Sequence, residues 1–244
     1  MTTPIVEANE VVKTFGHGRV KVRALKSVSL ALEPGRLTLL MGPSGSGKTT
    51  LLSILGCMLR PDSGSVRICG AATEKAGPEQ LAEIRRKHIG FVFQLFHLFS
   101  TLTAAENVQL ALDVRGERGR KARARSRDML AQVGLANRAN AFPRELSGGE
   151  QQRVAIARAV VANPDVILAD EPTAALDGDN GRAIMNILAR IAGEQGSAVL
   201  VVTHDSRIIQ FADRIIHIED GILREQETPE GSVYPLRIRS FRAP

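Results

Sequence analysis

The chain contains no tryptophan and only one tyrosine among its 244 residues. Proteins that hold single-stranded nucleic acid stack the bases on exposed aromatic rings, so we expect no nucleic-acid partner. Cysteine is also scarce, and Cys57 and Cys69 show neither the CxxC nor the histidine spacing of a zinc site. We therefore expect two buried or partly buried thiols in a reducing compartment.

Long apolar runs and a leader are missing as well. No apolar run reaches the roughly 18 residues that a membrane-spanning helix needs, and no signal peptide opens the sequence. These absences favour a cytoplasmic protein that reaches a membrane only through a partner. Hydrophobic residues make up 43% of the chain, as in a globular protein with a sizeable core. A length of 244 residues suits one large α/β domain or one domain with a sub-domain.

The basic excess of the chain is local. Residues 115–127 carry seven Arg or Lys and one Glu, and their net charge of +6 equals that of the whole chain. One interpretation is a patch that faces anionic lipid headgroups or an acidic partner. The other is a solvated, mobile connection without a ligand. No DNA- or RNA-binding motif accompanies the charge.

The hydrophobic pattern changes along the chain. Short strands with turn signals fill residues 5–40, including a turn at 15–18 and a buried strand at 37–41. A helix should cover 48–58, and residues 95–160 have the composition and spacing of helices. Strands and helices then alternate, as in a mainly parallel sheet. We expect strands at 166–170, 198–204 and 214–220, and helices at 181–195 and 206–213.

A glycine-rich loop, GPSGSGKT at 42–49, joins the apolar strand to the helix. Its glycines let the backbone curl so that N–H groups point at phosphate oxygens, and the helix N-terminus adds positive potential. Lys48 would reach the β- and γ-phosphates, and the Thr49 hydroxyl would bind Mg²⁺. The candidate nucleotide-binding residues here are Gly42, Pro43, Ser44, Gly45, Ser46, Gly47, Lys48, Thr49 and Thr50.

Two acidic residues follow a second buried strand. Asp170 stands at the carboxyl end of that strand, where open α/β sheets bind ligands, and is a candidate for holding Mg²⁺. Glu171 could polarise an attacking water as general base. Paired acids after a strand can also simply cap the next helix, but the phosphate loop upstream favours the metal and base roles.

Taken together, these motifs resemble those of the ATP-binding cassette (ABC) ATPases. LSGGE at 146–150 is similar to their signature motif, which is the most specific of the set. Gln94 matches the Q-loop glutamine, AALD at 174–177 resembles the D-loop, and His204 matches the switch histidine. Phe15 stands where the family often carries an aromatic ring that stacks on adenine. The resemblance covers about residues 5–224.

The resemblance implies a fold and a domain organisation. The fold would be a P-loop NTPase core of class α/β, with a mainly parallel sheet flanked by helices. An antiparallel β region at the N-terminus and an inserted helical sub-domain at about 95–160 would complete an ABC ATPase domain at 5–224. Residues 225–244 would be a tail of unreadable role.

It also implies a two-subunit active site. GPSGSGKT resembles the family's Walker A loop, and LADE at 168–171 resembles its Walker B motif. In the family, two ATPases pack head to tail, and each ATP lies between the Walker motifs of one subunit and the signature motif of the other. Ser147, Gly148, Gly149 and Glu150 would then meet the γ-phosphate of the partner's ATP. Glu171, His204 and Gln94 would be the catalytic residues, Thr49, Gln94 and Asp170 would hold the metal, and Asp177 would order the dimer interface.

A narrower resemblance is to macrolide-export and lipoprotein-release ATPases, with DevA-type exporter ATPases as the nearest match. It rests on IGFVFQLFHLFSTLTAAENV, LADEPTAALD and the segment around His204. It implies an exporter subunit on the inner face of the cell membrane. Its partners would be a separate membrane permease and, as often in that group, a periplasmic adaptor.

Two other functions stay open. An ABC ATPase that regulates cell division through a permease-like partner would have nearly the same sequence. A non-transport ABC ATPase in DNA repair or translation is disfavoured, because Ser147 follows Lys48 by only 99 residues without sustained heptads. The cargo cannot be read from this chain, because the permease and the adaptor select it.

Overall fold

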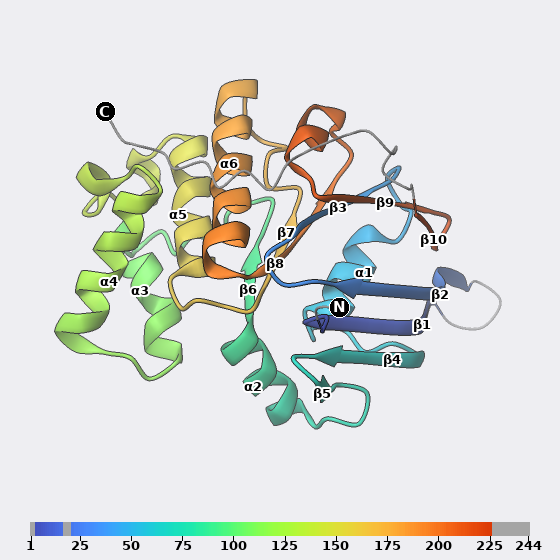
Figure 1. Cartoon of the computed structure of the whole chain (residues 1–244). Coiled ribbons are helices and arrows are strands. Elements are labelled where there is room, and N and C mark those ends of the chain that lie inside the picture. The colour runs from blue at the N-terminus through green and yellow to red at the C-terminus, as the bar shows by residue number, and fades with distance from the viewer. Residues whose placement is uncertain (1–2, 17–20, 226–244) are drawn as a thin grey trace.

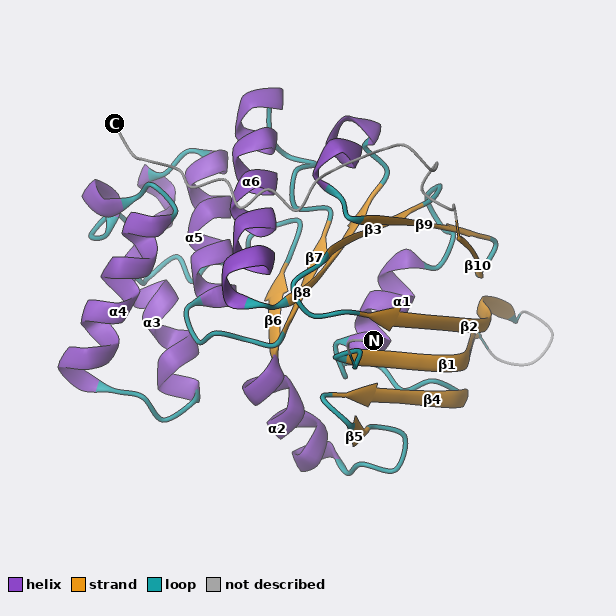
Figure 2. Cartoon of the chain, viewed as in Figure 1, coloured by secondary structure: helices purple, strands orange, loops and turns teal. Residues whose placement is uncertain are grey.

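The computed structural model describes residues 3–16 and 21–225. The expected turn at 15–18 falls partly outside these residues, and the tail beyond 225 lies wholly outside them. Two sheets form the framework, with helices gathered beside the larger one (Figure 1). Figure 2 shows the same view by secondary structure, with helices α3 to α6 on one side and the strands of the smaller sheet on the other.

The larger sheet has six strands in the order β10-β9-β3-β8-β7-β6. All neighbours are parallel except β9 and β10, as the alternation of strands and helices predicts. Its strands are β3 (Leu37–Met41), β6 (Ile89–Val92), β7 (Val166–Asp170), β8 (Ala198–Thr203), β9 (Arg214–Glu219) and β10 (Ile222–Glu225). The carboxyl ends of β3, β6, β7 and β8 therefore lie along one edge, where the candidate residues are placed.

The smaller sheet is antiparallel, in the order β2-β1-β4-β5. It confirms the antiparallel region that was expected near the N-terminus. Its strands are β1 (Val6–Phe15), β2 (Val22–Leu32), β4 (Ser63–Ile68) and β5 (Ala71–Ala72).

Two hydrophobic cores flank the larger sheet. Leu39 on β3 packs into one core and its neighbour Leu40 into the other, because successive side chains of a strand point to opposite faces. Helix α1 (Lys48–Leu55) fills the core between the two sheets. Helices α5 (Gly148–Val160) and α6 (Gly178–Gln195) cover the opposite face, and α3 (Ala104–Val114) and α4 (Gly119–Gln132) pack against α5.

The segment 95–160 is helical from Ala104 onward, and its helices α3, α4 and α5 pack on one another. Short 3-10 turns at Ala136–Arg138 and Pro143–Glu145 connect α4 to α5. The helices agree with the expected sub-domain. The division of the chain into a domain at 5–224 and a sub-domain within it stays a prediction.

Several expected elements differ from the structure. Helix α1 ends at Leu55 rather than near residue 58, because Gly56 caps it and Cys57 turns to a left-handed φ of 54°. The helix expected at 206–213 is a 3-10 helix, Ser206–Phe211. Strand β10 follows the turn at Gly221, where no further strand was expected. Helix α2 (Pro78–His88) was also missed, since its pattern is strongly polar. No helix in the described ranges is long and apolar enough to cross a membrane.

Candidate nucleotide site

The phosphate loop is held by close contact with neighbouring backbone. A Cβ atom on Gly42 would lie 2.1 Å from the carbonyl oxygen of Ile218, and one on Gly47 would lie 2.5 Å from that of Ala24. Gly47 also has a φ of 104°, which side chains rarely adopt. Only glycine fits at both positions, so the loop runs from β3 into α1 along one fixed path.

The middle of the loop faces open space. Gly45 has a φ of 80°, and no heavy atom lies within 4 Å of the place where its Cβ would stand. Pro43 and Ser44 are exposed beside it. No side chain among the described residues caps the start of α1 at Gly47, so its first N–H groups are free to bind an anion.

Lys48 is buried, and its Nζ donates to the carbonyl oxygens of Gly42 and Pro43 at 2.8 and 2.7 Å. Its ammonium group therefore lies over the concave side of the loop. The Ser46 hydroxyl is buried without a partner among the described residues. Thr50 lies half-buried in the first turn of α1. This arrangement can hold a polyphosphate.

Asp170 ends strand β7 as expected, and the Thr49 hydroxyl donates a hydrogen bond to its carboxylate. Burial raises the pKa of Asp170 above its ordinary value. The neighbouring Glu171 raises this pKa further, and the bond from Thr49 opposes the shift. A hydroxyl oxygen and a carboxylate oxygen side by side are the donors that Mg²⁺ prefers, so the pair fits this ion.

Glu171 follows Asp170 in a strained backbone conformation. Its φ is 46°, and its N–H donates to the carbonyl oxygen of Val202 at 2.9 Å. Its Oε1 lies 2.7 Å from Nδ1 of His204, while Oε2 is buried without a partner among the described residues. A buried carboxylate oxygen in this state is ready to accept a hydrogen bond from water. The acids therefore do not cap the next helix, a role that falls to Asp177.

Gln94 follows β6 by two residues and is exposed. Strand β6 pairs in parallel with β7, with Val92 opposite Ala169. Gln94 therefore lies at the same edge as Asp170. The structure thus brings the phosphate loop, Gln94, the two acids and His204 together at one edge of the larger sheet.

The LSGGE segment begins helix α5. The Ser147 Oγ accepts from the Glu150 N–H at 3.3 Å, and the Glu150 carboxylate accepts from the Ser147 N–H at 2.8 Å. This reciprocal pair is a capping box. Arg138 Nε also donates to Glu150 at 2.9 Å. Ser147 and Glu150 therefore have a structural role at the helix start, while the Ser147 O–H stays available to donate.

The two glycines of the segment have different surroundings. A Cβ on Gly149 would lie 2.7 Å from Oδ1 of Asn180, whereas a Cβ on Gly148 would find its nearest neighbours at 3.9 Å. Approach to a phosphate was the reason expected for both. The structure gives Gly149 a packing reason instead, a contact with the start of α6. Sequence patterns could not reveal this role of Asn180.

No hydrogen bond or ion pair among the described residues joins 146–150 to the loop at 42–50. Phe15 ends β1 rather than lying in a turn, and it is 44% exposed, as a stacking platform would be. Asp177 caps α6 by accepting from the Asn180 N–H at 2.9 Å. Its role at a dimer interface stays a prediction.

Two expectations from composition are wrong. Most of the basic segment is not a mobile connection, because it forms the first two turns of α4 and the turn before it. Arg115 donates to the carbonyl oxygens of Arg86, Lys87 and Ala162, which fixes this turn to the core. Cys69 is exposed rather than buried, although Cys57 is buried as expected. A lipid contact of the exposed arginines stays a prediction.

Known proteins with similar sequences identify the family of this chain. The family model for ABC transporters matches residues 25–174. The macrolide export ATP-binding/permease protein MacB of Rhodopseudomonas palustris is 44% identical over 223 residues, which are 91% of this chain and 34% of that protein. MacB of Salmonella typhimurium is 44% identical over 219 residues, 90% of this chain and 34% of that protein. The chain thus spans about a third of the length of these curated relatives.

Solved cassettes match along nearly their whole length. A dimeric structure of MJ0796, described as a bacterial ABC transporter cassette, is 44% identical in sequence and has a TM-score of 0.84. The match covers 91% of this chain and 98% of the MJ0796 chain. A dimeric post-hydrolysis state of MJ0796, bound to ADP and Pi, has 43% identity and a TM-score of 0.83, and covers 91% of this chain and 99% of its own. The likeness to MacB agrees with the macrolide-export group, while the narrower likeness to DevA-type ATPases stays a prediction. The protein belongs to the ABC transporter family and is one of its ATP-hydrolysing cassettes.

Proposed function

We propose that this chain is the ATP-hydrolysing subunit of an export system and drives a separate membrane permease through closure of a cassette dimer. The observation that carries the proposal is the Glu171–His204 pair, held 2.7 Å apart beside Asp170 and Thr49. These groups stand at the strand edge that also carries the phosphate loop. A base, its partner and a metal-binding pair are thus preassembled around one phosphate position.

Each residue has a distinct task in the reaction. The loop N–H groups and Lys48 bind the phosphates, and this ordering removes much of the entropy cost of reaching the transition state. Glu171 accepts a proton from the attacking water through its buried carboxylate, and His204 orients that carboxylate. Bound Mg²⁺ would neutralise phosphate charge, with Thr49, Asp170 and Gln94 as the residues that hold it.

Dimerisation completes the site. The start of α5 is a helix N-terminus with a free serine O–H, which suits a γ-phosphate, but it makes no contact with the described phosphate loop of its own chain. In a head-to-tail pair, Ser147 and the following glycines would serve the ATP bound by the partner. ATP would then stabilise the closed dimer, and hydrolysis would release it.

The partner in the membrane would contact the segment that follows Gln94. Leu95 is 70% exposed and Phe99 is 53% exposed, so this segment offers two large apolar side chains to a partner. A permease seated there would sense the state of Gln94 and hold the chain on the inner face of the cell membrane. The names of the MacB relatives, export ATP-binding/permease proteins, support an export role. The resemblance to macrolide-export and lipoprotein-release ATPases suggests a periplasmic adaptor as a further partner.

Replacing the proposed base tests this function. Glu171→Gln should bind ATP with nearly unchanged affinity, and its turnover should fall by about 100- to 10,000-fold, because a general base contributes that much. It should also accumulate as an ATP-bound dimer in size-exclusion chromatography. Glu79→Gln changes an exposed acid on α2 and serves as the control, with turnover unchanged.

Turnover of Glu171→Gln near the unmutated rate would refute the base assignment. The export role needs the membrane partner as well. The chain should co-purify with a permease, and Leu95→Ser with Phe99→Ser should abolish this association while ATP binding persists. Retained association of that double variant would exclude the proposed contact surface.

A further inference from the structure

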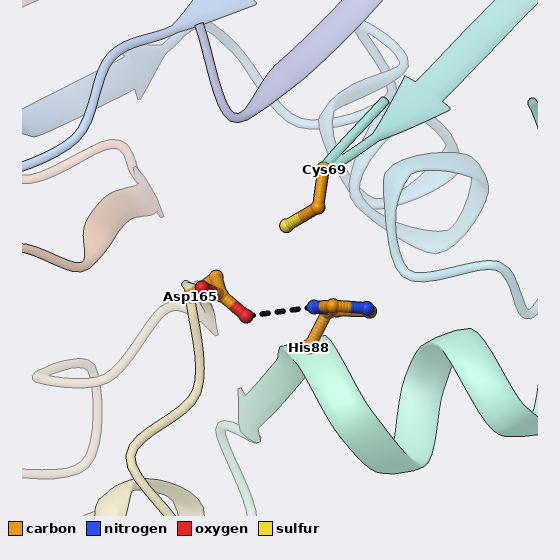
Figure 3. Close-up of side chains that lie close together, drawn as sticks. All are labelled: Cys69, His88 and Asp165. Atoms are coloured by element: carbon orange, nitrogen blue, oxygen red, sulfur yellow. Dashed lines mark hydrogen bonds and ion pairs between the residues drawn. The ribbon is translucent and has the colours of Figure 1, made fainter. Parts of the chain in front are cut away.

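Three side chains of types that can ligate a metal converge on the surface, away from the candidate nucleotide site. Cys69 lies in the turn between β4 and β5, His88 ends α2, and Asp165 precedes β7. Their ligand atoms all lie within 4.8 Å of one another. Figure 3 shows the Cys69 thiol pointing toward the hydrogen-bonded pair of His88 and Asp165, whose Nδ1 and Oδ2 are 2.7 Å apart. It is the one such group in the part of the chain that the structure describes.

The backbone holds these side chains in place independently of any ion. The Cys69 N–H donates to the carbonyl oxygen of Ile5 at 2.7 Å, and the Asp165 carbonyl oxygen accepts from the Ala198 N–H at 2.8 Å. His88 is fixed as the last residue of α2. A site that is assembled before the ligand arrives loses little conformational entropy on binding.

Neither turn geometry nor packing explains cysteine at position 69. Cys69 and Gly70 form a two-residue connection with φ values of 48° and 79°. Asn, Asp and Gly are the residues that favour this left-handed conformation in hairpin turns. Cys69 is exposed, so its thiol adds nothing to a core.

The donor set selects the kind of ligand. A thiolate, an imidazole nitrogen and a carboxylate oxygen carry a total charge of −2, which balances a divalent cation. Sulfur and nitrogen donors favour Zn²⁺ and similar thiophilic ions over Mg²⁺ and Ca²⁺. We propose that Cys69, His88 and Asp165 bind a thiophilic divalent cation of the Zn²⁺ type, with water in the remaining position.

Binding requires two local changes. Zn–ligand bonds of about 2.0–2.3 Å place tetrahedral ligands more than 3 Å apart, so the bond between His88 and Asp165 must open slightly. The thiol loses its proton to solvent as the sulfur–metal bond forms. Because the sulfur binds the ion as a thiolate, a proton is released on binding and the affinity falls as the pH is lowered.

The bound ion would cross-link the two sheets. Cys69 belongs to the hairpin of the smaller sheet, whereas Asp165 leads into a strand of the larger sheet and His88 directly precedes β6. Occupancy would stabilise the folded state by mass action. This inference does not depend on export or on ATP hydrolysis.

The test uses the full chain, stripped with a chelator and kept free of nucleotide. Zn²⁺ added in a calorimeter should bind with a stoichiometry near one per chain and raise the melting temperature. Co²⁺ should give a sulfur-to-cobalt charge-transfer band. Cys69→Ser should lose this band and weaken Zn²⁺ binding by at least about tenfold, because the soft ligand is gone. Cys57→Ala removes the other thiol and should keep both signals.

His88→Asn should weaken binding while it keeps the band at saturating Co²⁺, which separates ligand loss from loss of fold. The proposal would be overturned by three outcomes. They are equal Zn²⁺ affinity in Cys69→Ser and the parent, a band that disappears in Cys57→Ala instead, or no saturable Zn²⁺ binding by the parent at micromolar concentration.

Discussion

At the scale of single residues, the edge of the larger sheet that carries the candidate nucleotide site, here called the nucleotide edge, contains groups that do not favour folding. Glu171 has a left-handed φ and a buried oxygen without a partner among the described residues, and Asp170 is a half-buried acid beside another acid. Strain and partly buried charge of this kind cost stability and persist where the surrounding structure holds them for function. Sequence motifs named both acids, but only the fold shows this cost.

The substitution Asp170→Asn should remove part of this cost in stability. Because folding raises the pKa of Asp170, the native state binds this proton more firmly than the unfolded chain. Stability therefore falls as the pH rises from the ordinary carboxyl pKa to the raised one, and the loss is complete above that window. The variant should be more stable than the parent at neutral pH without Mg²⁺ and should lose this advantage in acid.

Urea unfolding at several pH values measures this difference in stability between the variant and the parent. Asp128→Asn, which changes an exposed acid on α4, serves as the control. A variant that gained no stability at neutral pH would contradict the argument. Mg²⁺-dependent ATP hydrolysis should be lost in Asp170→Asn in either case.

Ser147 should show two separable effects. Ser147→Ala removes the cap of α5 and should cost about 1 kcal/mol of stability. Thr103 and Glu106 form the same capping box at α3, so Thr103→Ala should cost a similar amount. Only the Ser147 variant should also lose ATP hydrolysis. Equal turnover of the two variants, at matched stability, would show that Ser147 is only a helix cap.

At the scale of elements, the start of α5 depends on the start of α6. Gly149 packs on Asn180, whose side chain also donates to Asp177 at 2.9 Å and accepts from Arg153 at 3.3 Å. Asn180 therefore cannot move away freely. Helix α5 and the D-loop-like segment at 174–177 are therefore connected through Asn180. A substitution in one of them should affect the position of the other.

The two neighbouring glycines should respond differently to substitution by alanine. Gly149→Ala should lower the free energy of unfolding by about 1–3 kcal/mol, because its Cβ would overlap Asn180. Gly148→Ala has ordinary space around it and should leave stability equal or up to about 1 kcal/mol higher through helix propensity. Chemical denaturation of the two variants makes the comparison. A larger loss in Gly148→Ala would refute this account of the packing.

At the scale of the whole molecule, the proposed head-to-tail dimer implies that each chain holds two incomplete half-sites. The phosphate loop and its acids form one, and the capped start of α5 forms the other. A single chain that cannot bring them together should be a poor ATPase. Its specific activity should therefore rise with protein concentration, as a dimer forms.

Mixing two inactive variants tests this arrangement directly. Lys48→Ala should disable the phosphate loop and Ser147→Ala the signature, so each alone should have little activity. An equimolar mixture forms heterodimers with one intact site and one doubly damaged site. About a quarter of the parental activity should return, since about half of random dimers are mixed and each has one working site. No recovery in the mixture would refute sites shared between two chains.

The sequence by itself determined the chemistry at the nucleotide edge. GPSGSGKT, the acids after a buried strand, and LSGGE are local patterns whose residue types follow from phosphate, metal and helix-start requirements. For the same reason most strands of the larger sheet could be predicted, because a buried parallel strand is a continuous apolar run. Helix α2 was missed because its exposed face makes it mostly polar, and the basic segment was misjudged because its anchoring contacts lie far away in the chain.

Tertiary structure alone decided the rest. The contact of Gly149 with Asn180, the pairing of Glu171 with His204, and the meeting of Cys69, His88 and Asp165 join residues that are 31, 33 and up to 96 positions apart. No local pattern encodes such distances, because they depend on how the two sheets and their helices pack. Composition and spacing show no zinc motif in the sequence, yet the fold brings together the three side chains of the proposed cation site from three separate elements.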